Sequence, residues 1–99
     1  MKKPFDMGLF LSGVLIGSRA TRQRHLRQAQ IMHVAIQQRW NLDNPWTWQL
    51  KHVSWFINRY LEKHAPATRY SYLLTALHIC KRLGKSELWG RVLTRSASV

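Results

Sequence analysis

The sequence predicts an all-α fold, a small bundle of three main helices with a short C-terminal helix and an apolar N-terminal segment. Apolar residues recur at steps of three and four along three stretches of the chain. Two breaks that contain proline, at residues 41–45 and 65–67, separate these stretches. No strand-like alternation extends beyond four residues, so we expect no sheet. Residues 1–99 should form one basic helical domain, with the apolar segment at 1–18, a helical core at 19–95 and a tail at 96–99.

The first helix is expected over residues 21–40. Its apolar face is predicted to contain Leu26, Ala29, Met32, His33, Ile36 and Trp40. Ile31 and Val34 lie outside this face, which predicts a helix covered on two sides. Several arginines accompany the helix, namely Arg19, Arg22, Arg24, Arg27 and Arg39.

The second helix is expected from Pro45 to about His64. Asn44 is its predicted cap, and a proline in the first turn lacks only an N–H that has no partner there. The predicted core stripe of this helix contains Trp46, Leu50, Val53, Ile57, Tyr60 and Leu61.

The third helix is expected from a cap at Thr68 to a C-terminal Gly84. Its predicted stripe contains Tyr70, Leu73, Leu74, Leu77, Cys80 and Leu83. Ser86 is the predicted cap of the last short helix, in which Glu87 suits the helix dipole. Its packing residues are expected to be Leu88, Trp89, Val92 and Leu93.

The charge balance indicates an acidic partner. Lys and Arg number 16 against 4 Asp and Glu, a formal net charge of +12. Solubility of a small domain needs a net charge of only about 2–8. The excess favours nucleic acid, an anionic membrane surface or an acidic protein face as the partner. Because a mimic of DNA must be acidic, the charge excludes DNA mimicry.

Catalytic, cofactor and metal sites are not expected. The five histidines include no pair three or four residues apart, so no helical metal pair exists. Cys80 falls in a core stripe and is expected to be a small buried apolar residue. One cysteine forms no internal disulfide, which suits a reducing cytoplasm. We therefore expect a cytoplasmic binding protein and not an enzyme.

The N-terminal apolar run, Met7 to Gly17, is too short to span a bilayer, which takes about 20 apolar residues. No small-x-small cleavage site follows it, so a cleaved signal peptide is not expected. A core segment or a partner-docking segment is the favoured interpretation, with no membrane partner. A peripheral membrane segment, built on residues 7–16 and the arginines, is the remaining alternative.

One constellation indicates a recognition surface on the second helix. Trp48, His52, Trp55 and Arg59 lie at steps of four, three and four, opposite the predicted core stripe. Trp and Arg are over-represented in binding hot spots. The candidate partner-binding residues are Trp48, His52, Trp55, Arg59, Lys51, Lys63, Arg22, Arg24 and Arg27. The alternative is a helix buried on both sides, with the first helix or the N-terminal segment covering the tryptophans.

The chain resembles the lambdoid-phage anti-RecBCD accessory recombination proteins. The resemblance rests on residues 27–85, which run RQAQIMHVAIQQRWNLDNPWTWQLKHVSWFINRYLEKHAPATRYSYLLTALHICKRLGK, and on the length, basic balance and tryptophan-rich middle. It implies binding to the host RecBCD helicase–nuclease through RecC, in the host cytoplasm. RecBCD would be inhibited or redirected, so that phage recombination uses the DNA ends. It also implies a host prolyl isomerase as a candidate partner. That partner points to Pro66, or to the Asn44–Pro45 and Lys3–Pro4 bonds, because X-Pro bonds have an accessible cis state.

A second resemblance leads to a different function. Residues 46–56 and 66–73 are similar to the helical DNA-clamping N-terminal domain of tyrosine recombinases. The catalytic domain of that family has no room in this chain. This resemblance therefore implies a stand-alone DNA-binding module. DNA held beside RecBCD is an intermediate possibility.

Overall fold

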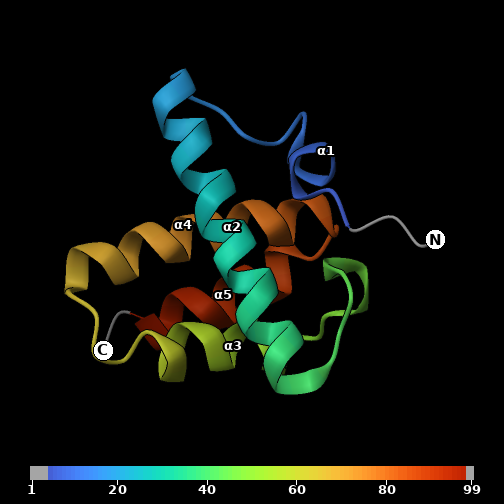
Figure 1. Ribbon diagram of the computed structural model, residues 1–99. Helices are drawn as coiled ribbons and strands as arrows, with labels where there is room; N and C mark the ends of the chain where they lie inside the picture. Colours follow the sequence, from blue (N-terminus) through green and yellow to red (C-terminus); the bar gives the residue numbers. More distant parts are fainter. Residues whose placement is uncertain (1–4, 98–99) are drawn as a thin grey trace.

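The computed structural model describes residues 5–97, and within them it contains helices and no strand (Figure 1). The predicted all-α fold is confirmed. The elements in chain order are α1 (Met7–Leu11), α2 (Arg19–Trp40), the 3₁₀ turn η1 (Pro45–Thr47), α3 (Leu50–Trp55), the π-helical turn η2 (Phe56–Tyr60), α4 (Pro66–Arg82) and α5 (Ser86–Ala97). None of the helices in this range has the length and apolar character needed to cross a bilayer.

Helices α2 and α4 organise the bundle. The long α2 crosses α4 (Figure 1). Helix α5 packs against α4 and also contacts η2. The largest completely buried apolar side chains come from every layer of this packing: Leu11, Met32, Ile36, Phe56, Ile57, Leu61, Ile79 and Leu93. One continuous core therefore joins the chain from α1 to α5.

Helix α2 agrees closely with its predicted apolar face. It starts two residues earlier than expected, because Ser18 caps it by accepting a hydrogen bond from the Thr21 N–H at 3.2 Å. It ends where Asn41 takes the left-handed conformation, at φ 58°. The prediction that Ile31 and Val34 lie under a second cover is wrong, because both are exposed.

The second predicted helix is not continuous. Asn44 caps η1 as expected, but Trp48 and Gln49 then take extended backbone angles, with ψ of 146° and 166°. A new helix starts at Leu50, and its last turn widens into η2, which ends at Tyr60 instead of His64. The predicted stripe is correct at Val53, Ile57 and Leu61, which are buried, and wrong at Trp46 and Tyr60, which are exposed.

Helix α4 begins at Pro66, so the predicted cap at Thr68 is wrong. Proline fits the first helical turn, and Ala65 precedes it without a side-chain cap bond. Tyr70, in the second turn of α4, is exposed and does not belong to the core stripe. The predicted stop at Gly84 is confirmed. Gly84 has φ +73°, and the Lys85 N–H bonds to the Cys80 carbonyl at 2.9 Å, as in a Schellman motif.

Helix α5 is longer than expected and includes Ser96 and Ala97, which were predicted to be tail; residues 98–99 lie outside the described part. Ser86 is its first residue and not its cap, since the Lys85 carbonyl accepts the first bond, from the Trp89 N–H. Trp89 and Leu93 are buried and Val92 is half-buried, whereas Leu88 is exposed and is a wrong packing prediction.

The N-terminal apolar run forms the short helix α1, which packs against α2 and α4. Asp6 caps it, with Oδ1 accepting a hydrogen bond from the Leu9 N–H at 3.0 Å. Met7, Phe10 and Leu11 are buried, so this part of the run is core. Leu9 and Ile16 remain exposed.

Candidate interaction surfaces

The predicted recognition face of Trp48, His52 and Trp55 is not a surface. Trp48 is 4% exposed and His52 is 5% exposed, and Trp55 is half-buried. The extended residues before α3 turn the Trp48 indole into the core, and His52 and Val53 are the buried residues of α3 itself. Trp48 and His52 are therefore buried, as the alternative interpretation expected, but Trp46 and Tyr60 are exposed, so the segment is not buried on both sides.

Trp40, at the end of α2, covers His52 and Trp55. Such a cover by the first helix was the alternative expected from the sequence. The Trp40 ring centroid lies 4.7 Å from that of His52 and 5.0 Å from that of Trp55. His52 Nδ1 accepts a hydrogen bond from the Gln49 N–H at 2.9 Å, which needs the unprotonated nitrogen. Burial, and then the charge of Lys51, lower the pKa of His52. These contacts pack the end of α2 against α3.

The predicted cations are exposed, and among the described residues Lys51, Arg59 and Lys63 make no cation–π contact with Trp48 or Trp55. Lys51, Arg59 and Lys63 lie on the α3–η2 segment and the turn after it. Arg22, Arg24 and Arg27 lie on the exposed side of the N-terminal half of α2. The arginines of α2 therefore remain candidates for partner contact, now without Trp48 and His52.

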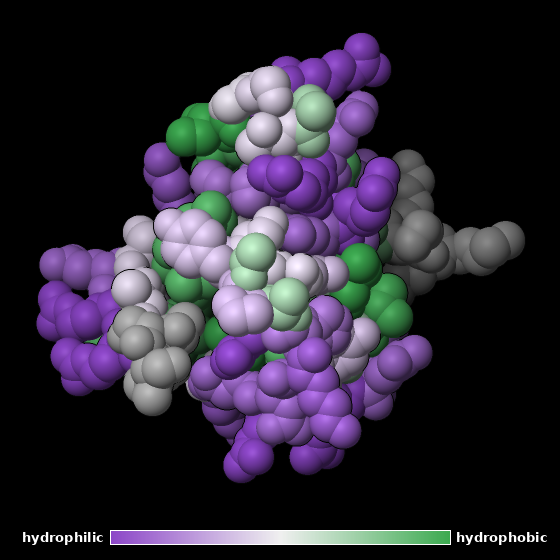
Figure 2. Space-filling view, turned by 90° about the vertical axis from the view of Figure 1, so that its left-hand side faces the viewer, coloured by the Kyte–Doolittle hydropathy of each residue, from purple (hydrophilic) through white to green (hydrophobic). Residues whose placement is uncertain are grey.

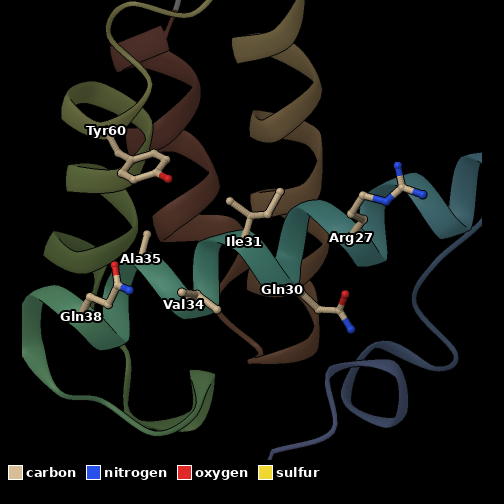
Figure 3. A pocket seen from close by; sticks show the side chains of 7 residues that line it. All are labelled: Arg27, Gln30, Ile31, Val34, Ala35, Gln38 and Tyr60. Carbon is tan, nitrogen blue, oxygen red and sulfur yellow. The ribbon is translucent and has the colours of Figure 1, made fainter.

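The exposed side of α2 carries an apolar hollow that the sequence did not reveal (Figure 3). It has a volume of about 280 Å³ and lies between α2 and Tyr60 of η2. We name this hollow the outer α2 surface. Its residues are Arg27, Gln30, Ile31, Val34, Ala35, Gln38 and Tyr60. Figure 3 shows Ile31 and Tyr60 on the same side of α2, with Arg27 farther along the helix. The position of Ile31 and Val34 off the core face was the signal available in the sequence.

The surroundings of this hollow are basic. The sequence of α2, RATRQRHLRQAQIMHVAIQQRW, contains no Asp or Glu. Hydrophilic residues predominate on the face shown in Figure 2, and the hydrophobic residues form small separate patches there. An apolar hollow beside uncompensated arginines fits a partner that is acidic and has apolar side chains to insert.

A polar chain crosses the seam between α2 and α4. His25 Nδ1 lies 2.7 Å from Thr75 Oγ1, and the Thr75 hydroxyl donates to Gln28 Oε1 at 2.6 Å. Since the Thr75 proton is directed to Gln28, His25 Nδ1 is the donor to Thr75. The His78 ring lies 5.1 Å from the His25 ring. Burial lowers the pKa of His25, and the neighbouring charges of His78 and Arg24 lower it further. The arrangement satisfies buried polar groups in a packed seam.

Three further predictions concern residues that could take part in metal binding or catalysis. Within residues 5–97 no three His, Cys, Asp or Glu side chains gather in a geometry suited to a metal ion. Cys80 is buried among core residues, as expected, and burial raises the pKa of its thiol to about 12. His33, expected on the apolar face of the first helix, is half-buried, with its Nε2 2.7 Å from the Asp43 carbonyl oxygen.

The proline candidates differ in accessibility. Pro66 is exposed at the first turn of α4, and Pro45 is buried in η1. Both peptide bonds before them are trans. Lys3–Pro4 lies outside the described residues. An enzyme acting on a folded chain would therefore reach Pro66 more readily than Pro45.

The chain matches no protein-family model, and the comparisons with curated proteins and with solved structures gave no match.

Proposed function

We propose that this chain is a phage protein that binds the host RecBCD helicase–nuclease through RecC, in the bacterial cytoplasm. Its effect is to inhibit or redirect the processing of DNA ends in favour of phage recombination. It acts by binding and not by catalysis. The resemblance of residues 27–85 to the anti-RecBCD family supports the choice of partner.

The observation that carries the proposal is the outer α2 surface. Val34 is 52% exposed and Tyr60 is 45% exposed beside Arg27. Tyrosine and arginine are typical hot-spot residues, and an apolar centre with a charged rim is the usual anatomy of a protein interface. A net charge of +12 selects an acidic face of the partner and accelerates encounter.

The test is complex formation between the purified chain and purified RecBCD at micromolar concentration and moderate salt. We expect co-elution in gel filtration and altered degradation of linear DNA. Val34→Asp should weaken binding at least about 30-fold, the effect of a hot-spot loss of about 2 kcal/mol.

Leu88→Asp is the matched control, because Leu88 is 64% exposed on α5 and the substitution changes the charge equally. It should leave binding within about twofold of the original affinity. Separate elution of the unaltered chain and RecBCD would overturn the proposed partner. Equal losses in both variants would remove the outer α2 surface from the interface.

A stand-alone DNA-binding module is the second candidate function. The exposed arginines Arg19, Arg22, Arg24 and Arg27 on an acid-free helix favour it. Binding through phosphate contacts weakens steeply with salt, by about 10³-fold between 50 and 200 mM for about six contacts. Affinities for a DNA duplex and for RecBCD across that range separate the two functions. Tight, salt-sensitive DNA binding without RecBCD would favour the DNA-binding module, or DNA held beside the enzyme.

A host prolyl isomerase is a second proposed partner, with Pro66 as its target. The exposure of Pro66 at the start of α4 supports this choice over Pro45. Replacing Pro66 by Ala keeps a residue that tolerates the first helical turn and removes the isomerisable bond. Capture of a purified prolyl isomerase by the original chain, and not by Pro66→Ala, is the expected outcome.

A further inference from the structure

A second surface lies where α1, η1 and α4 meet, and it shares no residue with the outer α2 surface. Its centre is the side chain of Arg82. The Arg82 Nε donates a hydrogen bond to the Phe10 carbonyl oxygen at 2.8 Å. The guanidinium carbon lies 4.9 Å from the Trp46 ring centroid and 5.5 Å from the Phe10 ring centroid. One hydrogen bond and two aromatic rings therefore hold the guanidinium in place.

The rings around Arg82 are fixed as well. Phe10 is buried in the core, and its ring meets that of Trp46 edge-on, with centroids 5.1 Å apart and planes at 86°. Trp46 follows buried Pro45 in η1, and its backbone N–H donates to Asn44 Oδ1 at 2.9 Å. An aromatic side chain positioned in this way loses little conformational entropy when it binds.

The open side of this arrangement is an apolar pocket of about 230 Å³. Trp46 is 55% exposed and Leu9 is 72% exposed at its edge. Phe5 forms part of the wall and packs against Phe10, with ring centroids 5.4 Å apart. The lining residues are Phe5, Asp6, Leu9, Phe10, Trp46 and Arg82. A pocket of this size accommodates one large apolar side chain.

The chemistry of Arg82 identifies what lies beside that side chain. Among residues 5–97, the bond from Nε is the single hydrogen bond of the Arg82 side chain. Its two terminal Nη groups therefore have no acceptor among these residues. These groups form a planar fork that matches the two oxygens of a carboxylate. Because the fork is already held, binding a carboxylate costs little ordering of the arginine.

We propose that this pocket, the Trp46–Arg82 site, binds an acidic segment of a partner protein. An apolar side chain of that segment fills the pocket between Leu9 and Trp46, and a neighbouring carboxylate pairs with the Arg82 fork. The proposal does not rest on the identity of the partner as RecBCD.

Charge and the apolar lining together decide between three classes of occupant. A second copy of the chain carries the same +12 and is repelled. The exposed Leu9 gives a nucleotide no specific contact, whereas an apolar side chain of a peptide packs against it. An acidic peptide satisfies the net charge, the arginine fork and the apolar wall together.

The test uses two short capped peptides and the full chain. One peptide consists of aspartates and glutamates around a single phenylalanine, and the other has serine in place of that phenylalanine. We expect the first peptide to shift the NMR signal of the Trp46 indole N–H, assigned from a Trp46→Phe variant. The serine peptide should bind at least about tenfold more weakly, since an aromatic anchor contributes more than 1.4 kcal/mol.

The variants Trp46→Ala and Arg82→Gln should each weaken binding of the phenylalanine peptide at least about tenfold. Arg82→Gln also removes the bond to the Phe10 carbonyl, so Leu9→Ser is the second variant, because it leaves this bond intact. Leu88→Ser on α5 is the matched control and should bind the peptide normally.

Unchanged affinity in Trp46→Ala and Leu9→Ser would overturn the site. A thymidine oligonucleotide that displaces the peptide from Trp46 would assign the pocket to nucleic acid and overturn the proposed occupant. Both results are independent of whether Val34→Asp weakens binding to RecBCD.

Discussion

Two tryptophans two residues apart, Trp46 and Trp48, lie in opposite environments. Trp46 is 55% exposed beside Arg82, whereas Trp48 is 4% exposed in the core. A single continuous helix predicts the reverse assignment for both. The extended backbone at Trp48 and Gln49 is the cause, because it ends η1 and lets α3 begin in a new orientation.

The comparison extends to the aromatic clusters around the two residues. Trp40, His52 and Trp55 pack ring against ring and close the junction of α2 with α3. Phe10 and Trp46 pack around a cation and leave one side open to solvent. Aromatic and basic residues in the same stretch thus serve stability in one place and offer a binding surface in the other. Backbone geometry, and not composition, separates the two.

The largest expected effect is the difference between truncating each tryptophan. Trp48→Ala should lower the free energy of unfolding by about 3–5 kcal/mol, the usual cost of emptying a buried tryptophan site. A domain with about 5–10 kcal/mol of stability would then be close to unfolding. Trp46→Ala should cost less than about 1 kcal/mol, as exposed substitutions do. Urea denaturation of both variants measures the difference, and equal losses would contradict the assignment of the two environments.

Trp48→Phe sharpens this comparison. The indole Nε1 of Trp48 is buried, and within the described residues it has no hydrogen-bond partner. Leaving such a group desolvated costs about 1–3 kcal/mol, so its removal offsets part of the lost packing. We expect Trp48→Phe to retain most of the stability that Trp48→Ala loses. A loss as large as that of Trp48→Ala would indicate that the N–H is satisfied in solution, for example by water.

Trp55→Ala is expected to have the next largest effect, about 2–3 kcal/mol, because a half-buried ring loses less packing than a fully buried one. The contact with Trp40, at 5.0 Å between centroids, would be removed. Binding of RecBCD should then decrease only in proportion to the unfolded fraction. A thermal melt and a binding titration on the same variant measure both quantities. Loss of binding at unchanged melting temperature would restore Trp55 to the interface.

The sequence predicted the helices of this protein better than their faces. The apolar face of α2 was correct at Leu26, Ala29, Met32 and Ile36, because one uninterrupted helix keeps its period over many turns. The stop at Gly84 was correct because a glycine readily takes the left-handed conformation. In the second predicted helix the errors lie at its interruptions, at Trp46 in η1 and at Tyr60 in the widened turn η2, whereas Val53, Ile57 and Leu61 are buried as predicted.

The candidate site could be predicted only in part, for a related reason. Arg22, Arg24 and Arg27 were chosen correctly as exposed cations, since long charged side chains are rarely buried. The Trp46–Arg82 site joins residues 36 positions apart in sequence, and the outer α2 surface joins Val34 to Tyr60. Such sites depend on how helices cross, and a single helical period contains no information about crossing.

Acid should destabilise the packing around His25, His52 and His78 before it affects the Trp46–Arg82 site. Burial is the main cause that lowers the pKa of His25, His52 and His78 in the folded chain. In the unfolded chain the histidine pKa is about 6.5. As the pH falls, the unfolded chain therefore binds more protons than the folded chain. Stability is then complete above that pKa and decreases as the pH falls through the lower folded values. We expect the melting temperature to fall between pH 7 and pH 5.

The groups facing His25 reinforce this direction. His78 of α4 and Arg24 of α2 both disfavour a positive charge on His25, and Lys81 does the same for His78. His25→Asn can still donate to Thr75 from its amide nitrogen and cannot gain a proton. This variant should show a smaller decrease in melting temperature than the original chain. An equal decrease would show that His25 contributes nothing to the acid sensitivity.

The smallest expected effect concerns the turn that separates Trp46 from Trp48. Asn44 Oδ1 accepts from the Trp46 N–H at 2.9 Å, and the Asn44 carbonyl oxygen accepts from the Thr47 hydroxyl at 2.7 Å. Asn44→Ala removes the side-chain acceptor and should cost about 1 kcal/mol, the usual value for a lost cap. Asn44→Asp keeps an acceptor at the same place and should cost much less. Because the cap orients Trp46, Asn44→Ala should also weaken the acidic peptide more than Asn44→Asp does. Denaturation and peptide titration of the pair measure both effects. If Asn44→Ala keeps full stability and full peptide binding, Pro45 and the packing of Trp48 define the turn, and the cap has no part in directing one tryptophan outward and the other into the core.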